Sequence, residues 1–134
     1  METWSGYYSE AEAYYKTTVG AKKKERPFGN LVYYNLIGLA LEGFLTAMIT
    51  QNGNLPEHSS ISSMLRMLKK NYEVPESFIE ESRFYNKFMN FCSLEVLETL
   101  EPTDGEIDRM IQFVAQLKTW IDENRGVLEE TCQI

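Results

Sequence analysis

The sequence is poor in the residues on which most catalytic and metal sites depend. Its 134 residues include one histidine, His58, and two cysteines, Cys92 and Cys132. Two cysteines cannot build the disulfide framework of a small secreted domain, and no Cys and His cluster has zinc-ligand spacing. We therefore predict neither a metal nor a cofactor, and we expect the protein in a reducing compartment, the cytoplasm.

Sequence motifs for common chemistries are also missing. There is no phosphate-binding Gly-rich motif, no G-x-S-x-G, no H-E-x-x-H and no E-x-x-H pair of the kind that holds two irons in a helical bundle. No residue is therefore predicted to be catalytic on the strength of a motif.

Positive charge is in the minority. Thirteen Lys and Arg stand against twenty Asp and Glu, which gives a net charge of -7. Because phosphate binding depends largely on clustered Lys and Arg, we expect no DNA partner. The basic run at residues 22–26 fits either a solvated helix end or a local phosphate or RNA contact. No basic region followed by an apolar run opens the chain, so we expect no signal or transit peptide.

What the chain does contain is apolar residues at helical spacing. Hydrophobic residues make up 43% of the sequence, enough for one core, and no stretch alternates as a half-buried strand does. The pattern predicts a single all-α domain over residues 1–134, with an ordered core at about 8–123 and a short tail at 124–134. The expected architecture is an antiparallel up-and-down bundle of four long helices, with a short fifth helix left open.

Capping patterns and breakers predict where the helices begin and end. Ser9 with Glu12 and Thr103 with Glu106 have the S/T-x-x-E spacing of capping boxes. Ser59 or Ser60 can cap a third helix. The expected helices span about residues 9–25, 27–50, 60–71, from 75 onward, and 104–123. Whether Leu94–Leu100 forms a separate helix stays open.

The second predicted helix is apolar around nearly its whole circumference. The stretch from Leu31 to Ile49 is about long enough to cross a bilayer, but Asn35 and Glu42 lie within it, so we expect a buried core helix and no membrane partner. A narrow stripe of polar and small residues interrupts its apolar surface. This stripe fits either a solvent face with a close helix approach, or a cleft or dimer groove lined by Glu42. Its members are Asn35, Gly38, Glu42 and Thr46.

Candidate site residues follow from these positions. An acid within an apolar helix has a raised pKa if it is desolvated, which draws attention to Glu42. Arg83 is the best placed basic group of the fourth helix, although the pattern favours an exposed surface role for it. We group these two residues with Asn35 and Asn90 as a candidate cleft. His58 is a candidate loop ligand or an ordinary surface residue.

Several stretches carry a family resemblance. They are the pair Tyr14-Tyr15, the segment Tyr33-Tyr34-Asn35 leading into residues 40–47, the entry from Pro56 to Leu65, and the last helix from Thr103 to Trp120. In these the chain resembles the HEPN domains, helical bundles found with minimal nucleotidyltransferases and in many prokaryotic RNA-targeting toxins. The family's central pattern A-x-E-K-x-L-K-A is matched at Ala40, Glu42, Leu45 and Ala47, whereas Gly43 and Thr46 replace its lysines.

One departure from the family decides the functional expectation. Ribonucleases that resemble this chain carry an Arg followed after four to six residues by a His, and Arg66, Arg83 and Arg109 have no such His. The resemblance therefore implies a non-catalytic binding or accessory module, a homodimer, with a nucleotide or a nucleotidyltransferase as its partner. Two alternatives remain. One is a degenerate ribonuclease that uses Arg83, Asn90 and Glu42, and the other is a structural homodimer without a ligand.

Overall fold

The computed structural model of the protein describes residues 4–24, 28–53, 60–89 and 101–132, with the backbone alone at 89 and 125–132. Within these ranges every regular element is an α-helix, and the all-α prediction is confirmed. The predicted region Leu94–Leu100 lies outside the described residues. The helices are α1 (Trp4–Lys23), α2 (Asn30–Gln51), α3 (Ile61–Leu68), α4 (Glu76–Met89) and α5 (Asp104–Cys132).

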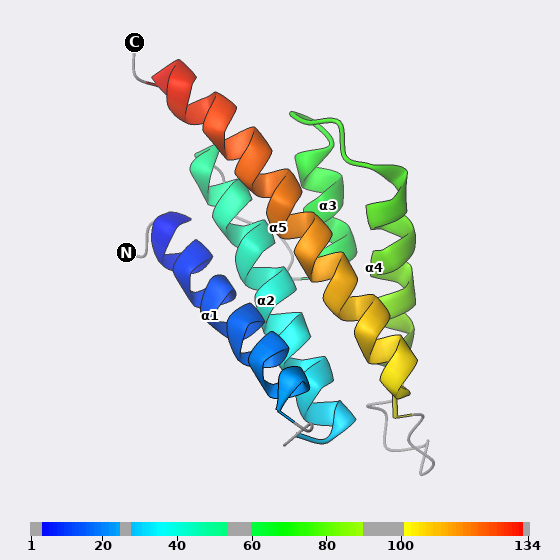
Figure 1. Ribbon diagram of the computed structural model, residues 1–134. Helices are drawn as coiled ribbons and strands as arrows, with labels where there is room; N and C mark the ends of the chain where they lie inside the picture. Colours follow the sequence, from blue (N-terminus) through cyan, green and yellow to red (C-terminus); the bar gives the residue numbers. More distant parts are fainter. Residues whose placement is uncertain (1–3, 25–27, 54–59, 90–100, 133–134) are drawn as a thin grey trace.

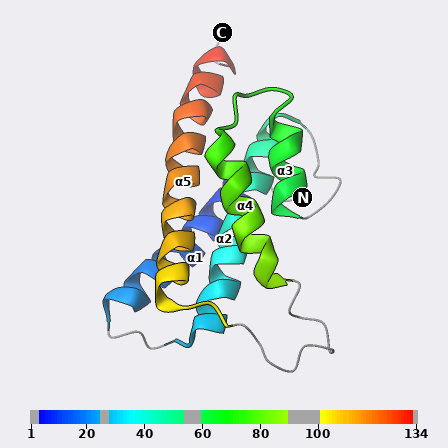
Figure 2. The same ribbon diagram turned by 90° about the vertical axis from the view of Figure 1, so that its right-hand side faces the viewer.

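The central element is α2, which packs against α1, α3 and α5 (Figure 1). Eleven of its 22 residues are buried. Among the described residues it is also the one helix long and apolar enough to span a membrane, and the other helices cover most of it, as predicted for a core helix. The start of α2 lies beside the start of α5, because the Asn30 amide donates to the Pro102 carbonyl oxygen at 2.8 Å. Helices α1 and α4 run in the direction opposite to α2 and α5 (Figure 1 and Figure 2).

Side-chain caps fix the starts of two helices as the sequence predicted. Before α5, the Glu106 backbone N–H donates to Thr103 Oγ1 at 3.2 Å and Glu106 Oε1 accepts from the Thr103 N–H at 2.9 Å. This is the reciprocal capping box. Before α3, Ser60 Oγ accepts from the Ser63 N–H, which decides between the two serines. Gly53 has a φ of 82° just after α2, a left-handed conformation that glycine adopts readily at the end of a helix.

Two predicted helix ends were wrong by more than a turn, and in addition α2 begins at Asn30 instead of 27 and α3 ends at Leu68 instead of 71. Ser9 lies inside α1, which begins at Trp4, so Ser9 and Glu12 form no capping box. The additional turn is held by Tyr8, whose ring packs edge-on against Phe44 at 5.3 Å. At the other end α5 continues past Glu123 to Cys132. Asn124 lies within this continuous helix, and its side-chain amide donates to the Trp120 carbonyl oxygen one turn earlier.

Helices α1 and α2 approach each other closely because a small residue of one faces a small residue of the other. A Cβ placed on Gly43 would lie 2.8 Å from the Ala11 Cβ, closer than side chains normally come. Ala11 is fully buried at this contact. Small residues at facing positions let two helix backbones come together, and here they set the spacing between α1 and α2.

Candidate functional site

The polar stripe of α2 turns from solvent toward α3 and α4 along its length. Asn35 is exposed, whereas Gly38 is buried, with the Tyr85 side chain of α4 filling the space of its missing Cβ. One turn beyond Glu42, the Thr46 hydroxyl donates to Met64 Sδ of α3 at 3.7 Å. The close helix approach predicted at Gly38 is not found: Gly38 makes room for a side chain, and among the described residues no Cα atom of α2 lies within 8 Å of one of α4.

Glu42 lies between these two contacts and is half-buried. Desolvation by burial raises the pKa of its carboxyl above the ordinary value. Among the described residues, no hydrogen bond or ion pair compensates this carboxyl. The Glu42 carboxylate is thus less stable in the folded protein than in water, as expected of an acid placed within an apolar helix.

The residues of the predicted cleft are not brought together by any described interaction. Arg83 is exposed on α4, and no described hydrogen bond or ion pair links it to Asn35 or Glu42. Asn90 and His58 lie outside the described residues. Two surface hollows are present among the described residues. One of about 360 Å³ lies at the starts of α2 and α5, and one of about 400 Å³ lies between α4 and α5. Neither is lined by Asn35, Glu42 or Arg83.

A polar cluster that the sequence interpretation missed joins α3 to α4. The Ser62 and Ser82 hydroxyl oxygens lie 3.1 Å apart, and the Asn86 amide donates to Ser62 Oγ at 2.8 Å. Ser82 is fully buried and also donates to the Ile79 carbonyl oxygen. Asn86 Oδ1 is buried and has no hydrogen-bond partner among the described atoms. The four-residue spacing of Ser82 and Asn86 within an amphipathic helix was the available signal.

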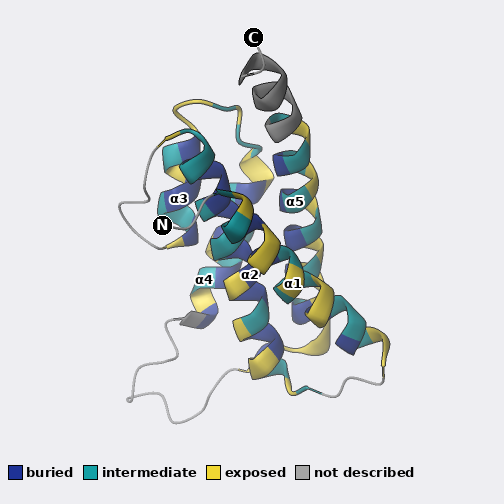
Figure 3. Cartoon of the chain, turned by 90° about the vertical axis from the view of Figure 1, so that its left-hand side faces the viewer, coloured by how far each residue is buried: buried dark blue, intermediate teal, exposed yellow. Residues whose placement is uncertain are grey.

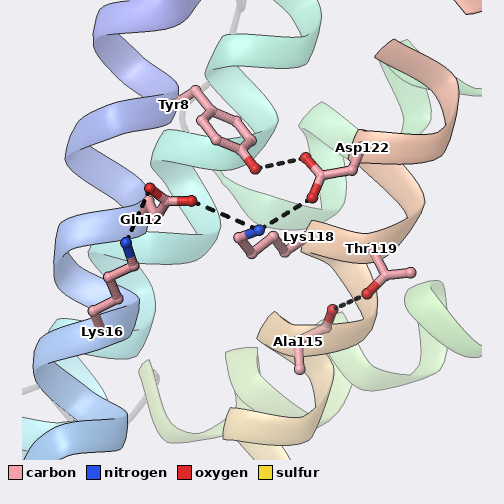
Figure 4. Close-up of polar contacts among 7 residues, drawn as sticks. All are labelled: Tyr8, Glu12, Lys16, Ala115, Lys118, Thr119 and Asp122. Atoms are coloured by element: carbon pink, nitrogen blue, oxygen red, sulfur yellow. Dashed lines mark hydrogen bonds and ion pairs between the residues drawn. The ribbon is translucent and has the colours of Figure 1, made fainter. Parts of the chain in front are cut away.

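A second cluster ties α1 to α5 (Figure 4). The Tyr8 hydroxyl donates to Asp122 Oδ1 at 2.5 Å, and Lys118 Nζ donates to Asp122 Oδ2 at 3.1 Å. Lys118 also lies 3.7 Å from Glu12 of α1, which pairs with Lys16. Burial and the Asp122 carboxylate raise the pKa of Tyr8. Burial alone would lower the pKa of Lys118, but Tyr8 and Asp122 outweigh it and raise that pKa.

Some basic side chains are engaged in contacts within the fold. Arg109 of α5 forms a two-pronged pair with Glu81 of α4, at 2.6 Å for its shortest contact, and its guanidinium lies 3.8 Å from the centre of the Phe84 ring. From the predicted basic run, Lys22 pairs with Asp108 at 2.9 Å. Lys22 therefore contributes to the contact between α1 and α5, and its side chain is not simply solvated at the end of α1.

The exposed surface of α2 is apolar. The helix has four exposed residues, and three of them are large hydrophobic side chains. They lie toward the start of α2, where Figure 3 shows yellow positions on the central helix between α1 and α4. We name this surface the α2 face, and it consists of Leu31, Val32, Asn35 and Leu39.

Among the described residues, no group of three or more His, Cys, Asp or Glu side chains could hold a metal ion. Comparison of the chain with protein-family models, with curated proteins and with solved structures finds no match. The HEPN resemblance therefore stays a prediction.

Proposed function

We propose that the chain is a non-catalytic, HEPN-like binding or accessory module that works as a homodimer. In this proposal the four long helices form the antiparallel up-and-down bundle of that family, and a nucleotide or a nucleotidyltransferase is the ligand that the resemblance implies. The observation that carries the proposal is the α2 face. A core helix that leaves Leu31, Val32 and Leu39 almost half exposed offers an apolar contact surface to another protein.

The engagement of the polar clusters supports binding rather than chemistry. Tyr8 with Asp122, Arg109 with Glu81, and Ser62 with Ser82 each join two helices. Their side chains are committed to contacts within the fold, which is typical of structural roles. Glu42, the one desolvated acid of the candidate set, has no described base or nucleophile hydrogen-bonded to it.

The proposal is tested with three samples of the protein. The wild type, Leu39→Glu and Gln112→Glu are immobilised and exposed to native lysate, and each is titrated calorimetrically with nucleoside mono-, di- and triphosphates. Gln112 is exposed on α5 and lines neither hollow, so its variant controls for the added charge. We expect a partner or nucleotide that the wild type and Gln112→Glu both bind, and weaker capture of a protein partner by Leu39→Glu.

Two outcomes would contradict the proposal. One is the absence of any ligand in both assays. The other is cleavage of RNA by the purified wild type that Arg83→Ala abolishes, because such a result would favour the degenerate ribonuclease.

A further inference from the structure

We propose that the α2 face is the contact between two copies of this chain, with Asn35 on the two-fold axis that relates them. The inference rests on the proposed function, since it names the second copy and the surface through which the module self-associates. The four residues of the α2 face lie on one side of one helix and all are exposed. Leu31, Val32 and Leu39 keep 47%, 45% and 43% of their surface in water.

The spacing of these residues is symmetrical about Asn35. Leu31 stands four residues before it and Leu39 four residues after it, so the three lie in one row along the helix. If two α2 helices cross antiparallel at Asn35, Leu31 of each copy meets Leu39 of the other. A two-fold interface requires a patch that fits itself in this way.

The chemistry of Asn35 fits a position on the axis. A residue on a two-fold axis faces its own copy, so it must be able to pair with itself. An amide carries both a donor and an acceptor, whereas a carboxylate or an ammonium group facing itself would be repelled. A single asparagine within an apolar helix seam is also a known device for fixing register and copy number.

Charge favours a second copy over a charged partner. With a net charge of -7, two copies repel each other at long range. Exposed positions on the other long helices include Glu10, Lys16, Glu80, Asp108 and Glu123, whereas the exposed positions of α2 carry no charge. The α2 face is thus a surface where two acidic chains can meet without placing like charges together. It also has no anionic group that would attract a basic partner.

The test is a substitution of Asn35 that keeps the shape of the side chain and adds a negative charge at the two-fold axis. Asn35→Asp adds one carboxylate per copy at an exposed position, and Asn71→Asp makes the same change at an exposed position in the turn after α3. Sedimentation equilibrium of both variants and the wild type gives the dimer dissociation constant. We expect Asn35→Asp to raise that constant by roughly tenfold or more, because like charges meet across the interface, and Asn71→Asp to leave it unchanged.

The remaining outcomes overturn the inference. A wild type that stays monomeric throughout the micromolar range would overturn the inference. Ligand binding would then be judged separately, by the lysate and calorimetry assays described above. A dimer that Asn35→Asp does not weaken would mean that another surface is used, with the binding module itself intact. A lower unfolding temperature of monomeric Asn35→Asp, relative to Asn71→Asp, would mean that this chain itself covers the face.

Discussion

Tyr34 of α2 and Tyr85 of α4 form a reciprocal pair, in which each hydroxyl donates to the backbone carbonyl oxygen of the other residue. The two bonds are 3.0 and 3.2 Å long, and the rings stack with centroids 4.4 Å apart and planes within 12°. Both rings are buried. The pair joins α2 to α4 through two residues that are 51 positions apart in the sequence. Gly38 makes it possible by leaving room for the Tyr85 hydroxyl.

Gly38→Ala should therefore destabilise the fold although alanine favours helices. The new Cβ would overlap the Tyr85 hydroxyl, and overpacking a core together with the loss of one hydrogen bond costs about 2 kcal/mol. Urea unfolding measures this loss. Gly20→Ala is the matched control, since no atom lies near its Cβ position in α1, and it should gain up to about 1 kcal/mol.

A double variant separates the overlap from other effects. In Gly38→Ala with Tyr85→Phe the overlapping hydroxyl is gone, so Gly38→Ala should cost little in that background. An unchanged cost in both backgrounds would contradict the role given to Tyr85.

Tyr8→Phe should lower the free energy of unfolding at pH 8 by about 1 to 2 kcal/mol, because it removes a hydrogen bond to the charged Asp122. The raised pKa values of Tyr8 and Lys118 mean that the stability from this cluster is complete below about pH 10, the ordinary value for tyrosine. That stability is lost as the pH rises through the raised values. The difference between wild type and Tyr8→Phe should thus shrink above pH 10.

The control for that experiment is Tyr15→Phe, which removes a hydroxyl of α1 with no described hydrogen bond. It should change stability little at either pH. Equal losses in the two variants at pH 8 would show that the bond to Asp122 contributes nothing specific.

Glu42→Gln should stabilise the protein at neutral pH. Burial raises the pKa of Glu42 in the folded protein. Below the ordinary value of 4.5 the carboxyl is neutral in both the folded and the unfolded state, and burying it then carries no charge penalty. As the pH rises through the raised pKa, the buried carboxyl becomes charged and the folded state loses stability. A neutral glutamine avoids that loss. Thermal unfolding at pH 7 and about pH 4 should show a gain for Glu42→Gln at pH 7 alone, while Glu73→Gln, at an exposed turn, changes little. A pH 7 gain shared by both variants would be an effect of net charge.

The two capping patterns of the sequence should respond differently to alanine. Thr103→Ala removes the acceptor for the Glu106 N–H and should cost about 1 kcal/mol. Ser9→Ala should be neutral or slightly stabilising, because Ser9 is an exposed residue within α1 and alanine is the better helix former there. Chemical unfolding compares them, and a cost at Ser9 would indicate that α1 begins later than Trp4.

Local chemistry explains what was predictable. Thr103 with Glu106, and Ser60 before α3, need only residues three positions away, so their spacing reveals them. Ser9 and Glu12 have the same spacing but lie within a helix, because contacts from Tyr8 to Phe44 and Asp122 extend α1 at its start. A cap pattern cannot reveal such long-range contacts.

The candidate site shows the same limit. The stripe on α2 indicated the desolvated acid at Glu42 and a small residue in a contact at Gly38, since helical spacing places them on one side, but the contact is with a side chain and not a close approach of two helices. The partners of the stripe come from α3 and α4, and sequence spacing says nothing about which of their residues face α2. For that reason Tyr85 was missed, and Arg83, two residues earlier on α4, was chosen although it faces solvent.

The central claim, that the protein associates through the α2 face, is tested most directly by methyl NMR over a concentration series. The account predicts that the signals of Leu31, Val32 and Leu39 shift together as the concentration rises, while those of the buried Leu117 and Val114 on α5 stay in place. Constant shifts at Leu31, Val32 and Leu39, or changes confined to residues elsewhere, would contradict it.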